Sequence, residues 1–258
     1  MIVLLSNDDG IDSPGLDAVH EALEQEWGKD THEIWVIAPD GERSGQSHSI
    51  TLKGPIRARK WGPRKYALSG TPADCVITAV LGIMPHKPDL VLSGINVGPN
   101  LGTDITYSGT AAAARQAAYM GIPAVALSLG DYKLPFHFSP LARFAAKHLN
   151  TFVSLANSDH FLNINAPNDP AEDRVPMITH PCRRMYNDRM VSFSAPRGDV
   201  YWFLDGTPID SDDETDSDWD AVQRGFISLS PIHLHPVKNE IENAYKKAFV
   251  PDSLHNGF

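Results

Sequence analysis

Short runs of apolar residues recur along the first two thirds of the chain. Three of them, at residues 2–5, 34–37 and 90–92, are continuous, and two more, at 124–129 and 161–164, include one polar residue each. Buried strands of a parallel sheet have this composition because helices cover both of their faces. The pattern therefore predicts a buried strand at each of these positions.

Segments with helical spacing lie between these runs. At residues 13–14 a serine precedes a proline, and apolar residues then recur every three or four positions until Gly28. A capping serine with proline in the first turn is typical of a helix start, and glycine of a helix end. The same pair at residues 139–140 predicts a second helix, and the alanine-rich segment 111–120 predicts a third.

The alternation of strand and helix defines the fold class. We predict that residues 1–165 form a Rossmann-like, doubly wound α/β catalytic domain with a mostly parallel sheet. After this point short alternating segments separated by Gly, Pro and Asp replace the long apolar runs. We therefore expect residues 166–258 to be a smaller β-rich C-terminal appendage and the oligomerisation region. A last helix, around 238–249, could pack on its own chain or on a neighbouring subunit. The strand candidates of the appendage are 191–194, 200–204 and 226–229.

Composition and charge narrow the function classes. The 258 residues are 42% hydrophobic and 21% charged, which allows a sizeable core. A net charge of −10 repels duplex nucleic acid, so a phosphate ligand needs a local cation or aimed backbone N–H groups. The first ten residues resemble neither a signal peptide nor a membrane span, and the only cysteines, Cys75 and Cys182, lie far apart. These features favour a cytoplasmic protein that does not bind membranes.

An acidic segment, residues 205–220, holds eight carboxylates. It lacks the register of a calcium-binding EF-hand loop, which needs glycine at its sixth and glutamate at its twelfth position. We expect a solvated loop whose last residues, Thr215 and Asp216, cap a short helix that ends at Gly225.

The strongest chemical signal is the sequence SNDDG at residues 6–10, directly after the first predicted strand. Ligands of open α/β sheets bind beyond the carboxyl ends of the strands. The adjacent carboxylates of Asp8 and Asp9 repel each other there unless a cation lies between them or one is protonated. Their hard oxygen atoms favour Mg²⁺ or Mn²⁺ over zinc. The alternative is that both residues only cap a loop.

Two further loops leave predicted strands at the same sheet edge. After the second strand, Ser44 offers a hydroxyl oxygen and Arg43 offers paired N–H donors to a phosphate. After the third, the glycine-rich segment 93–102 includes Asn96, whose amide oxygen is a neutral metal donor. The chain then continues through residues 107–110 into the alanine-rich helix, whose N-terminus favours an anion. Neither GxGxxG nor GxxxxGK spacing occurs in this stretch, and ordinary turns are the alternative for each loop taken alone.

Other candidate groups have ordinary explanations. Thr71 and Pro72 fit the start of a helix. His233 and His235 would share one strand face but lack a third metal ligand. A solvated loop is the expected setting for the arginines at residues 183, 184 and 189.

Five ordered motifs together resemble the SurE (survival protein E) family of metal-dependent nucleotidases. They are LLSNDDG with SPG (4–10, 13–15), APD with RSG (38–40, 43–45), GTPADC (70–75), SGIN with GPNLG (93–96, 98–102) and YSGT (107–110). A looser match runs from Thr215 to His233. Gly41 departs from the family, which often has an arginine there, and the segment 205–220 is unusually acidic.

The resemblance implies a Rossmann-like domain with a β-rich part that takes part in dimer or tetramer exchange, and so a homodimer or homotetramer. It implies hydrolysis of nucleoside 5′-monophosphates, with 3′-monophosphates and short polyphosphate as further substrates. It also implies one divalent cation, Mg²⁺ or Mn²⁺. The residues that match its ligands are Asp8, Asp9, Ser44 and Asn96. A phosphate-facing loop would be formed by Asn100, Ser108, Gly109 and Thr110, with Arg43 as a further phosphate contact.

The expected reaction is an in-line attack of water on a phosphoryl group polarised by the metal, with Asp8 and Asp9 as catalytic residues. The N–H groups of residues 108–110 would hold the equatorial oxygens. The general acid is not assigned, although Asp9 or Asp40 could shuttle a proton. One alternative is a phosphatase that forms an aspartyl-phosphate, as haloacid-dehalogenase-like enzymes do, but those place two aspartates one residue apart. The other is a nucleotide-binding sensor without turnover.

Overall fold

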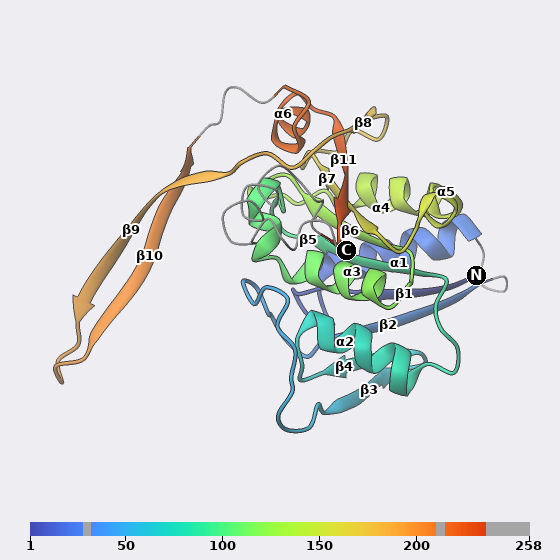
Figure 1. Cartoon of the computed structure of the whole chain (residues 1–258), viewed down its shortest axis with the longest axis horizontal. Coiled ribbons are helices and arrows are strands. Elements are labelled where there is room, and N and C mark those ends of the chain that lie inside the picture. Colours follow the sequence, from blue (N-terminus) through green and yellow to red (C-terminus); the bar gives the residue numbers. More distant parts are fainter. Residues whose placement is uncertain (28–31, 210–214, 236–258) are drawn as a thin grey trace, which may run out of the picture.

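A nine-stranded sheet forms the centre of the protein in the computed structural model, which describes residues 1–27, 32–209 and 215–235 (Figure 1). Six neighbouring strands, from β4 to β7, run parallel, and the antiparallel pairs lie toward the two edges. In sheet order the strands are β3 (Ala58–Gly62), β4 (Lys65–Leu68), β2 (Glu33–Pro39), β1 (Ile2–Ser6), β5 (Leu90–Asn96), β6 (Ala124–Leu129), β7 (His160–Ala166), β11 (Ile227–His233) and β8 (Pro176–Ile178). The five strands predicted from apolar runs are all present.

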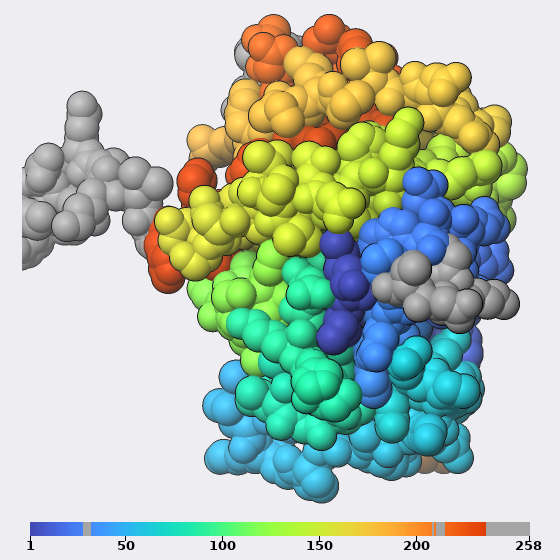
Figure 2. Space-filling view, turned by 90° about the vertical axis from the view of Figure 1, so that its right-hand side faces the viewer, coloured from blue at the N-terminus to red at the C-terminus, as the bar shows by residue number. Residues whose placement is uncertain are grey.

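Helices cover both faces of this sheet, which confirms the doubly wound α/β class. One apolar core contains α1 (Pro14–Trp27), α4 (Phe138–Lys147) and α5 (Leu149–Leu155). The other contains α2 (Pro72–Thr78), the π-helical turn η1 (Ala79–Ile83) and α3 (Gly109–Tyr119). Figure 2 shows the sheet order on the surface, with the colours of β3 and β4 at the bottom, the N-terminal strand in the middle and residues after 165 at the top. No helix of the described residues is both long and apolar enough to cross a membrane.

The apolar runs are continuous because successive side chains of a strand enter opposite cores. In β1, Val3 and Leu5 pack in the core of α1 and α4, whereas Leu4 packs in the core of α2 and α3. All three side chains are fully buried. A strand with this burial leaves no position for a polar residue until its carboxyl end, where Asp8 begins the site.

Two predicted helix starts differ in what caps them. α2 begins as expected, with Pro72 in the first turn and a capping box in which Thr71 accepts from the Asp74 backbone N–H while the Asp74 carboxylate accepts from that of Thr71. α1 also begins at its proline, but the buried hydroxyl of Ser13 has no partner among the described residues. The backbone carbonyl of Ser13, not its side chain, closes that first turn.

The helix predicted from residues 139–140 starts earlier and is interrupted. α4 begins at Phe138, with His137 in the cap position and no side-chain cap hydrogen bond, so the prediction that Ser139 caps this helix is wrong. Pro140 lies inside the first turn, where a missing N–H costs no intrahelical bond. His148 then separates α4 from α5.

A long hairpin extends away from the body of the molecule (Figure 1). Its strands, β9 (Met185–Ser194) and β10 (Val200–Ile209), pair antiparallel only with each other. They are longer than the segments predicted there, and the side chains described on both are exposed. The polypeptide after residue 165 also contributes β8 and β11 to the main sheet, so the division of the chain at that residue stays a prediction.

The acidic segment is not one solvated loop. Residues 205–209 belong to β10, and α6 (Asp218–Gln223) begins within the segment. The cap of α6 is Ser217, which accepts from the Asp220 N–H, so the prediction of a cap at Thr215 and Asp216 is wrong. Asp218 is buried because backbone N–H groups satisfy its carboxylate. Residues 210–214 and the predicted helix 238–249 lie outside the described residues.

Candidate metal and phosphate site

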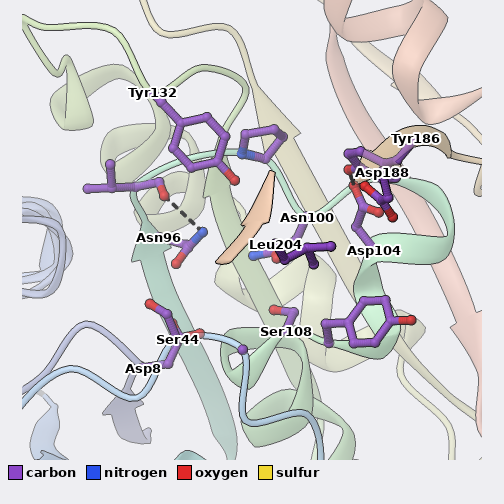
Figure 3. Close-up of a pocket in the computed structure, with 14 residues that line it drawn as sticks. Asp8, Ser44, Asn96, Asn100, Asp104, Ser108, Tyr132, Tyr186, Asp188 and Leu204 are labelled. Atoms are coloured by element: carbon purple, nitrogen blue, oxygen red, sulfur yellow. Dashed lines mark hydrogen bonds between the residues drawn. The ribbon is translucent and has the colours of Figure 1, made fainter. Parts of the chain in front are cut away.

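A pocket of about 510 Å³ opens at the carboxyl edge of the parallel strands (Figure 3). It lies where β1 and β5 are neighbours but their following helices, α1 and α3, pack on opposite faces. Crevices at such a switch point are where α/β sheets bind ligands. Its lining residues are Asp8, Ser44, Gly45, Asn96, Val97, Pro99, Asn100, Asp104, Tyr107, Ser108, Tyr132, Tyr186, Asp188 and Leu204.

Two adjacent carboxylates follow β1. Asp8 is 4% exposed, and its Oδ1 accepts from the Thr110 hydroxyl. Burial raises the pKa of the Asp8 carboxyl, although hydrogen bonds from the start of α3 oppose this. Asp9 accepts from the Val97 N–H, and its burial, the charge of Asp8 and that of Glu42 raise its pKa to about 6. Both raised pKa values mean that the fold disfavours the ionised forms of these two carboxyls.

No described residue supplies the missing positive charge. Neither carboxylate forms an ion pair with a described arginine, lysine or histidine. Arg43, the nearest candidate in the sequence, directs its guanidinium to Asp40, at 2.8 Å, and to the Glu42 carbonyl. Its backbone N–H instead donates to the Asp8 carbonyl at 2.7 Å. Arg43 therefore positions the loop against Asp8 and is not among the lining residues, and its contact with phosphate stays a prediction.

Two neutral oxygens face the same space. Asn96, the last residue of β5, donates through its Nδ2 to the carbonyls of Val97 and Gly98. Its Oδ1 consequently points to the other side, toward Asp8 (Figure 3). Ser44 donates its hydroxyl proton to Glu42 at 3.0 Å, which leaves the lone pairs of its oxygen available.

This donor set fits a hard divalent cation. Within the described ranges, no three His, Cys, Asp or Glu residues are grouped to hold a metal, so an ion here would rest on two carboxylates and neutral oxygens. Mg²⁺ and Mn²⁺ prefer such oxygen ligands and keep positions for water and phosphate. An ion would also remove the repulsion that raises the pKa of Asp9. Of the four predicted ligands, Asp8, Ser44 and Asn96 line the pocket together, whereas Asp9 adjoins Asp8 but is not among the lining residues. That these four residues hold the cation stays a prediction.

The predicted phosphate loop divides into two groups. Asn100 and Ser108 line the pocket, and Ser108 also caps α3 by accepting from the Ala111 N–H. Thr110 is fully buried against Asp8. Gly109 also packs against Asp8, since a Cβ atom on this glycine would lie 2.7 Å from the Cβ atom of Asp8. Both residues position Asp8 in this structure, and their contact with phosphate stays a prediction.

A buried network of polar side chains fixes Asn100. Its backbone N–H donates to Asn165, its carbonyl accepts from Asn163 and Asn165, and its Nδ2 donates to Ser128. These partners lie on β6 and β7 and are fully buried. Sequence reasoning missed them, although the asparagine inside the apolar run 161–164 was a visible signal.

The far wall of the pocket was not predicted either. It consists of Tyr132, from the loop after β6, of Tyr186 and Asp188 near the base of the hairpin, and of Leu204 from the middle of β10. The Tyr132 ring packs on Gly98, where a Cβ atom would lie 1.9 Å from the ring. Only the folded chain brings β9 and β10 to this edge of the sheet, so no local pattern could have indicated them.

These features define a class: a Rossmann-like α/β protein whose pocket offers oxygen ligands to a cation beside a helix N-terminus. Comparison with known proteins gives the particular family. A family model described as survival protein SurE matches residues 3–188, and the chain belongs to this family.

Individual relatives agree with this assignment. The 5′-nucleotidase SurE of Geotalea uraniireducens is 43% identical over 237 residues, which cover 91% of this chain and 93% of that protein. That of Pelobacter propionicus is 39% identical over 236 residues, 91% and 94% of the two chains. The crystal structure of the SurE protein from Aquifex aeolicus aligns with a TM-score of 0.82 at 34% identity and covers 96% of this chain and 99% of that one.

Proposed function

We propose that this protein hydrolyses nucleoside 5′-monophosphates to nucleoside and phosphate with one divalent cation, Mg²⁺ or Mn²⁺. The observation that carries the proposal is the pair of adjacent carboxylates of Asp8, which is buried, and Asp9, which is partly buried. No described cation compensates them, and the oxygens of Asn96 and Ser44 line the same pocket as Asp8. Relatives that cover nine tenths of the chain bear the name 5′-nucleotidase.

Different residues of the chain bind the cation and orient the phosphate. Asp8, Asp9, Ser44 and Asn96 would hold the cation, which when bound supplies Lewis-acid polarisation of the phosphoryl group. Asn100, kept rigid by its network, and Ser108 orient the phosphoryl oxygens at the start of α3, where N–H groups favour an anion. Water then attacks in line with the leaving oxygen.

The hairpin supports a homodimer or homotetramer. Apolar side chains are exposed on both strands, including Phe193, Trp202 and Phe203, which are all more than half exposed. A two-stranded ribbon with so much apolar surface is marginal alone and is stabilised when a second surface covers it. We therefore assign the hairpin to the contact between subunits. The two buried free thiols, Cys75 and Cys182, suit a reducing compartment, and we place the protein in the cytoplasm.

Phosphate release from AMP tests the proposal. We expect release with Mn²⁺ or Mg²⁺, none with EDTA, and a loss of at least a hundredfold in Asp9→Asn. Undiminished turnover in that variant would remove the assigned ligand. Tight AMP binding without release over hours would instead favour a sensor, and a trapped phosphoryl-enzyme would favour an aspartyl-phosphate route.

A further inference from the structure

The pocket has two halves of different chemistry. Cation and phosphate ligands occupy the half next to β1 and β5. We name the other the leaving-group half, formed by Asp104, Tyr132, Tyr186, Asp188 and Leu204. The tyrosine rings and the leucine offer apolar surface there, and the two aspartates offer hydrogen-bond acceptors (Figure 3).

The two carboxylates differ in their protein partners, because among the described residues only Asp104 is paired, through its Oδ2. Asp104 accepts from the Tyr186 hydroxyl and from Arg184, whose side chain is 5% exposed. The guanidinium of Arg184 also stacks on the Trp219 ring, 4.1 Å from its centroid, so the partners of this cation are residues of the protein. The Asp188 carboxylate, by contrast, has no hydrogen bond or ion pair within the part of the chain that the structure describes.

The hairpin places Asp188 at this wall. Asp188 on β9 is paired in register with Gly206 on β10, and a Cβ atom on Gly206 would lie 2.1 Å from the Asp188 carboxylate. The glycine thus leaves the room that this carboxylate occupies. Leu204, two residues before Gly206, lies on the same face of β10 and also lines the pocket.

We infer that Asp188 determines which leaving group the enzyme accepts. A carboxylate accepts hydrogen bonds from neutral donors such as the hydroxyls of a sugar or the amino group of a base, and it repels a second phosphate. A nucleoside monophosphate carries its only negative charge at the cation end, whereas a polyphosphate carries charge into the leaving-group half. Asp188 therefore favours a nucleoside and disfavours, without excluding, a polyphosphate chain. This inference rests on the proposed function.

A carboxylate-to-amide change tests this selection without altering shape. In Asp188→Asn we expect the KM for inorganic tripolyphosphate to fall about fivefold and the KM for AMP to rise about threefold, with kcat for each unchanged within about twofold. Leu204→Lys, which adds a cation to the same wall, should likewise favour tripolyphosphate. Asp173→Asn removes the same charge from an exposed residue outside the pocket and should leave both KM values as they are.

The deciding quantity is the ratio of the KM for tripolyphosphate to the KM for AMP. An unchanged ratio in Asp188→Asn, or an equal change in Asp173→Asn, would overturn the inference. Calorimetry of AMP and tripolyphosphate with the Mn²⁺-loaded protein gives the same ratio as dissociation constants, without turnover. A protein that shows the shift in binding but releases no phosphate would contradict the proposed function and leave the role of Asp188 supported.

Discussion

Removal of one charge from the acidic pair should make the metal-free protein more stable. The variant is Asp9→Asn, whose amide oxygen can still accept from the Val97 N–H. In the wild type, burial and then the charge of Asp8 raise the pKa of Asp9 from 3.8 to about 6. This rise in the pKa of Asp9 corresponds to a penalty of about 3 kcal/mol for its ionised form. Because Asp9 is partly exposed, solvent screening reduces this to about 1–2 kcal/mol.

The sign of the pH dependence follows from linkage. The folded protein keeps the Asp9 proton to a higher pH than the unfolded chain does, so the penalty is absent below about pH 4. It grows as the pH rises from about 4 to 6 and is complete above the folded pKa. In EDTA at pH 7.5, the free energy of unfolding of Asp9→Asn should therefore exceed that of the wild type by about 1–2 kcal/mol. This corresponds to a melting temperature about 3–6 °C higher. At pH 4 the two should unfold together.

Urea and thermal unfolding at both pH values measure the difference. Asp12→Asn, at an exposed position three residues further on, is the matched control and should behave as the wild type. Added Mn²⁺ should stabilise the wild type and not Asp9→Asn, which reverses the order of the two proteins. A metal-free variant that is no more stable than the wild type at pH 7.5 would refute the claim that burial and the charge of Asp8 destabilise the ionised Asp9.

Four other side chains give predictions of their own. Thr110→Val removes the hydroxyl that donates to Asp8 and should lower kcat/KM for AMP about tenfold, with Thr110→Ser restoring it; a fully active valine variant would remove the positioning role. Thr71→Ala breaks the capping box of α2 and should cost about 1 kcal/mol in urea unfolding, and an unchanged midpoint would contradict this. Burial acts to raise the pKa of Asp74, but hydrogen bonds from two threonines outweigh it and lower the pKa. The ionised carboxylate therefore stabilises the fold above about pH 4, and this stabilisation is lost on acidification. In acid titrations of stability, Asp74→Asn should lack this loss. Phe203→Glu on the exposed hairpin should shift the mass measured by light scattering toward the monomer, and an unchanged mass would argue against the hairpin as the contact.

The sequence predicted the strands whose burial is complete and missed those at the edge. Runs such as 90–92 are apolar because both sheet faces are covered, so composition alone marks them. β3, with the sequence ARKWG, is exposed along most of its length and shows no run at all. The hairpin strands are exposed on both sides, so nothing in their pattern marks where they end.

The site divides in the same way. Asp8, Ser44 and Asn96 were predicted together because each lies at or after the end of a parallel strand, and all such ends meet at one edge of the sheet. Tyr132 and Asp188 were missed because their place depends on how a loop and the hairpin base pack against that edge. Strand-end chemistry is local in sequence, whereas the wall opposite is a product of tertiary structure.

Asp218 gives the projecting hairpin a fixed root. One carboxylate receives the N–H of Gly102, in the glycine-rich loop beside the pocket, and that of Cys182, three residues before β9. The same carboxylate therefore ties the start of the hairpin to the loop that borders the pocket. Tyr186 and Asp188, shortly after this attachment, are thereby held beside the glycine-rich loop.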